Sequence, residues 1–178
     1  MKYLTLITIA CIGIVNMALA QALVTDPIAD FAQLAHAPNE RLLKLEVDLN
    51  HEGKRIIFLS RTNLWAGKEG NIWSVYIPVA DGYRKVEETD AGYPITFRPD
   101  RYFIGRMPGA KGSNLLMMFG PSGGGKGTLL GYQIVDSKVH EVTIKENFEP
   151  DGADKETYKK TFGSHFTRSV QELDFPKQ

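Results

Sequence analysis

Oxygen-bearing side chains recur at alternate positions in a polar segment between two apolar runs. Asp48, Asn50 and Glu52 hold its first, third and fifth positions, and Gly53 holds the sixth. A calcium ion takes six or more oxygen ligands, and a glycine lets the chain turn sharply around it. The backbone carbonyl of Lys54 would supply a further oxygen. The pattern therefore predicts a calcium site, and the alternative is a polar hairpin loop with Gly53 at a positive φ.

This segment resembles the calcium loops of FG-GAP/VCBS-type repeats, in which D-x-[DN]-x-D-G leads into an apolar strand, as residues 56–59 would here. The resemblance implies an extracellular, repeat-built β-propeller that serves adhesion or ligand binding. The sequence departs from the family at the fifth position, Glu52 in place of aspartate, and at the ninth, Ile56 in place of an acid. The Phe-Gly element of the family has its counterpart far downstream, at 119–120. An EF-hand is excluded because Leu59 replaces the twelfth-position glutamate.

A second segment that could carry a catalytic residue is rich in glycine. Gly120-Pro121-Ser122-Gly123-Gly124 matches G-x-S-x-G, the turn that presents a nucleophilic serine. An acid and a histidine would follow in the expected order, Asp136 or Asp151 and then His140 or His165. Such a turn needs a strand-to-helix junction in a parallel sheet, and no βαβ pattern is visible. A small serine hydrolase using Ser122, His140 and His165 is therefore the alternative, and a long exposed hairpin loop is the expectation.

The same stretch also spells G-x-x-x-x-G-K from Gly120 to Lys126. A phosphate loop needs serine or threonine next, where this chain has Gly127, and it needs a helix afterwards, where residues 129–135 read as a strand. We therefore expect no nucleotide site.

The two tryptophans flank a polar loop and have different expected roles. Trp73 falls on the apolar face of a predicted strand and belongs to the core, whereas Trp65 stands at a strand end. An exposed indole there is a candidate stacking platform for a sugar or a peptide. His140 shares strand parity with Val142 and Ile144, which predicts a half-buried structural residue.

The first twenty residues have the pattern of a signal peptide. Lys2 precedes an apolar run, and small residues around Ala20 and Ala22 offer two cleavage positions. We therefore expect export, to the periplasm or the medium, with no stable membrane span after cleavage. Cys11 is the single cysteine and lies in the removed segment, so the mature chain would contain no disulfide.

Composition bounds the remaining possibilities. The 178 residues carry 21 basic and 21 acidic side chains, and 43% are hydrophobic. The balanced charge argues against a nucleic-acid binder, and the hydrophobic content fits one folded domain. No cofactor is expected except the calcium ion proposed above.

Period-two alternation dominates the rest of the chain. A short helix is expected at 26–35, within a lead-in of 23–40, and the β domain spans 41–146. Strands are expected over 42–49, 55–59, 71–79, 83–88, 102–107, 115–119, 129–135 and 139–145. The segment 147–178 is expected to be partly helical and to pack on the sheet through phenylalanines.

The two strand sets resemble each other weakly, with residues 74–79 matching 130–135 at an offset of about 56 residues. The predicted fold class is mainly β: an antiparallel meander of about eight strands, forming a sandwich, an open barrel or two propeller-blade-like units. The predicted function is a non-enzymatic binding domain whose partner is an extracellular or periplasmic protein or a glycan. Its open sheet edges would also permit a dimer.

Overall fold

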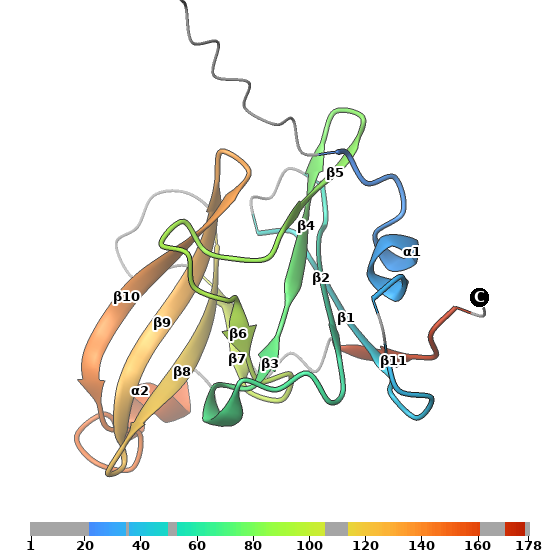
Figure 1. Ribbon diagram of the computed structural model, residues 1–178. Coiled ribbons are helices and arrows are strands. Elements are labelled where there is room, and N and C mark those ends of the chain that lie inside the picture. The colour runs from blue at the N-terminus through green and yellow to red at the C-terminus, as the bar shows by residue number, and fades with distance from the viewer. Residues whose placement is uncertain (1–21, 35, 50–52, 106–113, 161–169, 177–178) are drawn as a thin grey trace, which may run out of the picture.

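The computed structural model describes residues 22–34, 36–49, 53–105, 114–160 and 170–176. Within them, two antiparallel sheets face each other, and a short two-stranded ribbon lies between them (Figure 1). The two sheets do not join into a closed barrel. The mainly β, antiparallel fold predicted from the alternation is confirmed.

The first sheet has the strand order β11-β1-β2-β4-β5. Its members are β1 (Leu42–Val47), β2 (Ile56–Arg61), β4 (Ser74–Val79), β5 (Gly82–Val86) and β11 (Gln171–Leu173). The C-terminal β11 pairs with β1, so the predicted tail contributes an edge strand to this sheet.

The second sheet has the strand order β10-β9-β8-β7 and is a simple meander. Its members are β7 (Tyr102–Gly105), β8 (Leu115–Gly123), β9 (Lys126–Val135) and β10 (Lys138–Phe148). Four consecutive residues at the start of β8 are buried, Leu115 to Met118, as expected for a strand covered on both faces.

The core lies between the two sheets. Buried side chains of β1, β2 and β4 meet those of β8, β9 and β10, and the set includes Leu45, Phe58, Val75, Leu116, Tyr132 and Val139. At its centre the rings of Trp73 and Phe97 stack with centroids 4.3 Å apart, and the indole N–H of Trp73 donates to the carbonyl of Phe97 at 2.9 Å. Both side chains are completely buried, so this hydrogen bond satisfies a donor that has no access to water.

The predicted third strand, 71–79, is interrupted at Trp73. Its first part, β3 (Asn71–Ile72), pairs with β6 (Thr96–Phe97), whereas its second part, β4, pairs with β2 and β5. The backbone N–H of Trp73 donates to the carbonyl of Ile95 at the switch. The chain thus changes partners where its largest core side chain is inserted.

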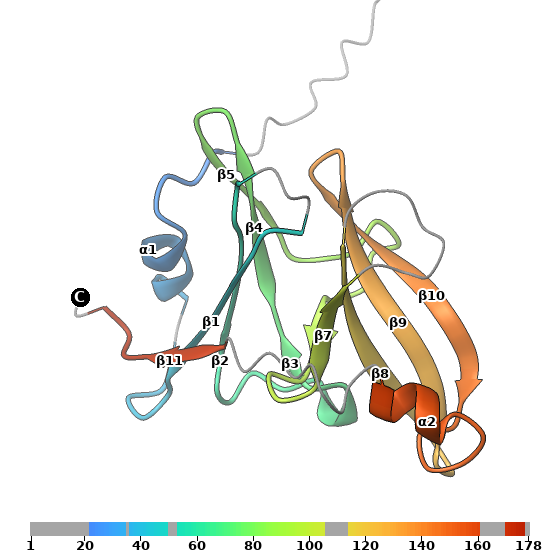
Figure 2. The ribbon, with the colours of Figure 1, turned by 180° about the vertical axis from the view of Figure 1, so that it is seen from behind.

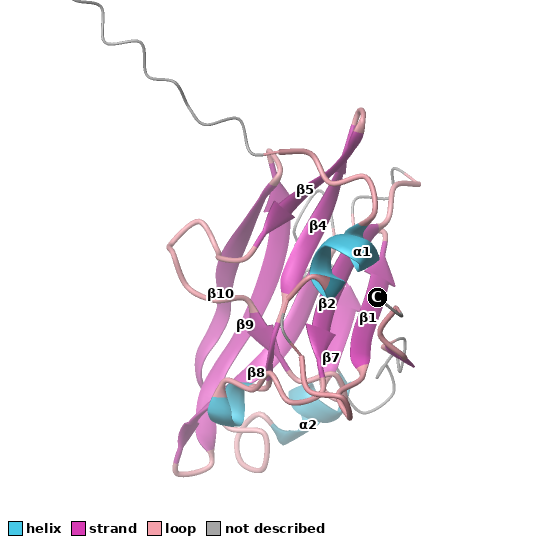
Figure 3. Cartoon of the chain, turned by 45° about the vertical axis from the view of Figure 1, so that its right-hand side comes forward, coloured by secondary structure: helices cyan, strands magenta, loops and turns pink. Residues whose placement is uncertain are grey.

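Small elements cover the outer faces of both sheets (Figures 2 and 3). Helix α1 (Pro27–Ala32) begins after Asp26, whose carboxylate accepts from the N–H groups of Ile28 and Ala29, and its Phe31 packs on the first sheet. Helix α2 (Lys155–Tyr158) adds Tyr158 to a cluster on the second sheet. The tail residue Phe175 packs against a buried cluster of the first sheet that includes Leu42 and Leu59.

The glycine-rich stretch is ordered differently from the long loop that was predicted. Strands β8 and β9 continue to Gly123 and from Lys126, so the turn consists of Gly124 and Gly125 alone. Both have positive φ, +59° and +77°, as a type I′ hairpin turn requires. The prediction of a hairpin is therefore confirmed, and the prediction of a long loop is wrong.

The predicted signal peptide lies outside the described residues, and in the described part no helix has the length and apolar character to cross a membrane.

A substitution at Gly70 tests the packing of the segment before β3. A β-carbon there would lie 2.6 Å from backbone atoms of Phe97 and Arg98, at a φ of +105°. Gly70→Ala is expected to lower the free energy of unfolding by more than about 2 kcal/mol, measured by urea titration. Gly92→Ala is the control, because its φ is also positive (+79°) but nothing lies within 4 Å. Equal losses in the two variants would contradict the steric explanation.

Candidate functional site

A cleft of about 790 Å³ opens between the second sheet and the segments that flank the two-stranded ribbon. Its floor is the inner face of β8, β9 and β10, and its wall is formed by η1 (Gly67–Glu69) and by the chain leading into β6. The lining residues carry apolar, hydroxyl-bearing and charged side chains: Met118, Leu130, Pro94, Tyr93, Tyr132, Thr96, Thr128, Thr143, Ser122, Lys68, Glu69, Glu141 and Glu146.

Strand register explains the composition of the floor. Leu130 on β9 lies opposite Met118 on β8 and Thr143 on β10, and Tyr132 lies opposite Glu141. Directly opposed residues of an antiparallel sheet share one face. The face that contributes Tyr132 to the core therefore continues outward into a polar, solvent-exposed surface at Glu141 and Thr143.

Tyr132 ties the floor to the wall. Its hydroxyl accepts from the backbone N–H of Thr96 at 3.1 Å and donates to the carbonyl of the same residue at 3.2 Å. Because its ring is buried, the pKa of Tyr132 is raised, and the negative charges of Glu141 and Glu69 act in the same direction. Tyr132 thus holds the wall in place as a neutral phenol.

The wall carries an exposed aromatic ring. Tyr93 is 63% exposed, and it is held by a turn in which the N–H of Thr89 donates to the carbonyl of Tyr93 and the N–H of Tyr93 donates to Oγ1 of Thr89. This turn is fixed to the edge of β10, where the N–H of Asp90 donates to the carbonyl of Val139. The Asp90 carboxylate also lies 2.7 Å from Nδ1 of His140. The ring is therefore presented by an anchored turn.

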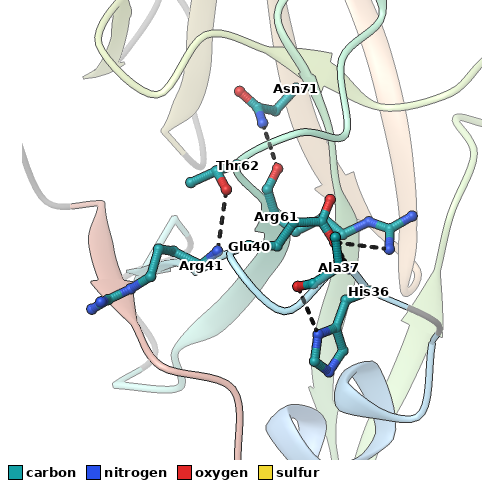
Figure 4. A network of polar contacts seen from close by, with 7 residues as sticks. All are labelled: His36, Ala37, Glu40, Arg41, Arg61, Thr62 and Asn71. Atoms are coloured by element: carbon teal, nitrogen blue, oxygen red, sulfur yellow. Dashed lines mark hydrogen bonds and ion pairs between the residues drawn. The ribbon is translucent and has the colours of Figure 1, made fainter.

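A polar network supports the loop that carries η1 (Figure 4). The buried Glu40 accepts from the N–H of Ala37 at 2.7 Å and pairs with Arg61 at 3.3 Å. The carbonyl of Arg61 accepts from the side-chain amide of Asn71 at 2.8 Å, at the other end of the loop. The amide oxygen of Asn71 is buried without a hydrogen-bond partner within the described structure. This network joins the start of β1, the end of β2 and the start of β3.

The cleft has an acidic balance. Glu69, Glu141 and Glu146 line it together with one basic side chain, Lys68. Partial burial raises the pKa of Glu141, and the charges of Glu69 and Asp90 raise it further. The negative charges are therefore close enough to disfavour one another.

The residues of the predicted calcium site are described only in part. One carboxylate oxygen of Asp48 accepts from the backbone N–H of Gly53 at 2.9 Å, and Gly53 has the positive φ of +72° that the hairpin interpretation predicts. Lys54 is exposed, whereas Asn50 and Glu52 lie outside the described residues. The described part contains no group of three acidic, histidine or cysteine side chains arranged to hold a metal ion.

The structure does not bring Ser122 and His140 together. Ser122 lies beside the β8–β9 turn and donates to the carbonyl of Lys126, whereas His140 lies opposite Gln133, near the other end of β9. This separates them by roughly 20 Å along the sheet. Asp136 forms the turn after β9, and Asp151 lies in the segment before α2. His165 lies outside the described residues. The half-buried position predicted for His140 is confirmed.

Trp65 is 51% exposed, as the platform hypothesis requires, and its indole N–H donates to the carbonyl of Thr62 at 2.7 Å. It stands one residue before Ala66, which lines the cleft. Sequence reasoning missed Tyr93 and Glu141. Glu141 alternates with Val142, so its polarity indicated a solvent face, and only the position of β6 shows that this face borders a cleft.

Comparison with known proteins gives no relative: no family model, no curated protein and no solved structure matches this chain. The resemblance to FG-GAP/VCBS repeats therefore stays a prediction. The interpretation of the cleft depends on its own geometry and charge.

Replacing Glu141 tests the electrostatics of the cleft. The pKa of Glu141 is higher in the folded than in the unfolded chain. At pH values above the folded pKa the ionised carboxylate therefore lowers the free energy of unfolding. At pH values below the unfolded pKa of about 4.3 this effect is lost. Glu141→Gln is expected to raise the free energy of unfolding at pH 7.5, by less than about 1 kcal/mol because solvent screens the exposed group. Urea unfolding at pH 7.5 and pH 4.0 measures this. An equal gain at both pH values would contradict the electrostatic origin.

Proposed function

We propose that this protein is an exported, non-enzymatic binding domain that takes its ligand in the cleft between η1, Tyr93 and the inner face of β8–β10. The observation that carries the proposal is the cleft of about 790 Å³, which lies on a sheet of paired strands beside the hydrophobic core. Ligand sites of small molecules have volumes of about 300–1,000 Å³ and combine apolar lining with a few polar groups.

The local architecture supports a preformed site. The floor belongs to three paired strands, and the wall is held by the two hydrogen bonds of Tyr132 and by the anchored turn at Thr89. A preformed site loses little conformational entropy on binding. The half-buried Leu130 lines the cleft and offers apolar contact, and the buried Met118 packs on the core beside it.

The proposal of binding without catalysis is supported by the position of Ser122. It reaches the cleft, but its hydroxyl donates to the backbone of Lys126, and His140 is near the far end of β9. A serine nucleophile needs a base within hydrogen-bond reach. The other side chains that line the cleft can bind a ligand through hydrogen bonds, charge or apolar contact.

Export is the second part of the proposal, and it is supported by the sequence of the first twenty residues. The ligand would then be met in the periplasm or outside the cell, as part of a protein or a glycan or as a free small molecule. The neutral net charge supports the proposal that nucleic acids are not partners.

A fragment screen by amide NMR tests the binding site. Residues 23–178 would be titrated with small ammonium, hydroxyl and carboxylate compounds. We expect at least one class to shift amides grouped around Thr128, Leu130 and Tyr132. Thr143→Trp is expected to abolish these shifts, because the larger side chain would fill the cleft. The variant is expected to fold, since tryptophan is accepted at an exposed strand position.

Thr143→Val is the control for this experiment, since it keeps a β-branched side chain and leaves the cleft open. Shifts located on the outer faces, or shifts that persist in Thr143→Trp, would contradict the proposed site. A screen with no binder in any class would contradict the proposed function.

We also propose that calcium braces the loop after β1 through Asp48, Asn50, Glu52 and the carbonyl of Lys54. The position of Asp48 supports this, since its carboxylate already folds the loop back on Gly53. An ion at this loop would strengthen the β1–β2 hairpin.

Thermal unfolding in EDTA and in millimolar calcium tests the loop. A ligand that binds only the native state raises its stability, so an upward shift of Tm is expected. Asp48→Asn is expected to abolish the shift, because asparagine keeps an oxygen for the Gly53 N–H but loses the charge that calcium needs. An unchanged Tm in the wild-type chain would leave the loop as a plain hairpin.

A further inference from the structure

The three carboxylates of the cleft have no ionic partner in the described part of the chain: none of its ion pairs includes Glu69, Glu141 or Glu146. The ion pairs that hold carboxylates are elsewhere, at Glu40, Glu46, Asp100, Glu149 and Asp154 among others. One ammonium group, that of Lys68, lines the same cleft. The cleft is thus an anionic surface whose charge Lys68 compensates only in part.

The spacing of these carboxylates favours a ligand larger than a metal ion. Within the described residues no three carboxylate, imidazole or thiol groups converge closely enough to hold a metal. Glu141 and Glu146 lie on the same strand, which places their Cα atoms about 16 Å apart in an extended chain. A ligand that engages this surface must therefore bring its positive charge on a molecular body of some size.

Aromatic and apolar groups complete the surface. Tyr93 presents a ring that is 63% exposed, and the half-buried Leu130 forms an apolar floor with the buried Met118 beside it. An ammonium group is attracted to the face of an aromatic ring, and more strongly where solvent is partly excluded. The same cleft therefore offers carboxylates for a charge and hydrocarbon for the group that carries it.

We propose that the cleft binds small organic cations, in which an ammonium group is attached to an apolar or aromatic body. This inference rests on the proposed function and specifies its ligand class. The Glu69 and Glu141 carboxylates attract the ammonium group, Tyr93 stacks against the ligand, and Leu130 and Met118 contact its apolar body. The volume of about 790 Å³ matches a small molecule, and charge complementarity selects a cation.

The test compares three probes of nearly equal shape. Phenethylammonium, 2-phenylethanol and 3-phenylpropionate carry charges of +1, 0 and −1 on the same phenylalkyl body. Amide NMR titration of residues 23–178 at pH 7.5 is expected to give the tightest binding for the ammonium compound, with shifts at the cleft residues. Affinity is expected to fall when salt rises from 0.05 to 0.5 M, because ions screen the attraction.

Variants assign the charge to individual residues. Glu69→Gln and Glu141→Gln are each expected to weaken phenethylammonium binding about two- to fivefold. Lys68→Gln is expected to strengthen it, because it removes a competing cation from the cleft. Glu172→Gln, on β11 of the other sheet, makes the same charge change elsewhere and is expected to leave affinity unchanged. The amide spectrum of each variant verifies its fold.

The outcomes separate this inference from the proposed function. Equal binding of the alcohol and the ammonium compound, or preference for the carboxylate, would overturn the cation specificity and leave the cleft as a binding site. If none of the three probes binds while another fragment class binds in the cleft, the cation specificity is overturned and the proposed binding function stands. A cleft that binds a lysine-containing peptide and none of the small probes would overturn it in favour of a protein partner. A cleft that binds nothing would overturn both proposals.

Discussion

The stacked pair of Trp73 and Phe97 is the contact on which the rest of the fold depends. Trp73 stands where the chain leaves β3 for β4, and Phe97 ends β6, so one ring contact joins the ribbon to the first sheet. Phe97 also meets the ring of Tyr102 at the start of the second sheet. The indole donates to the carbonyl of Phe97, which sets the pair in a single orientation. Because both residues are fully buried, the two sheets and the ribbon meet around this pair inside the core.

The cleft follows from this arrangement. The ribbon of β3 and β6 lies between the sheets, and the lower parts of β8, β9 and β10 extend beyond it (Figure 1). There the inner face of the second sheet meets η1 and the turn before β6, and polar side chains replace the core. Tyr132 stands at the boundary: its ring packs in the core, and its hydroxyl holds Thr96 in the wall. Core packing thus positions the residues that we propose bind a ligand.

The carboxylates of the cleft differ in burial and in partners from the carboxylates that stabilise the fold. Glu40 and Asp154 are buried carboxylates with basic partners and hydrogen bonds from backbone N–H groups, and they fix loops. Burying a charge without such partners would destabilise the protein. Glu141 remains exposed, with a pKa raised by partial burial and by neighbouring negative charge. Such a group contributes little to stability, and binding of a cation would relieve the repulsion around it.

Much of the secondary structure was determined by the sequence alone. Alternation in Leu43 to Leu49 produces β1, the Asp26-Pro27 pair starts α1, and Asp136-Ser137 turns the chain between β9 and β10, because each depends on neighbouring residues. The two-residue turn at Gly124-Gly125 was not predicted, since glycines are compatible with either a long loop or extended strands. The pairing of β8 with β9 as far as Lys126 shows that this stretch forms extended strands and not a long loop.

The residues of the proposed site are brought together by the packing of segments that are distant in the sequence. Glu141, Glu69 and Tyr93 are far apart along the chain and carry no motif, and they meet because β10, η1 and the turn before β6 surround one stretch of sheet. Conversely, Ser122 and His140 follow a motif-like order but are held at different ends of β9. Local patterns depend on the preferences of adjacent residues, whereas a cleft depends on how separate segments pack. The alternation in β10 distinguishes its two faces, and only the packing shows that the polar one borders a cavity.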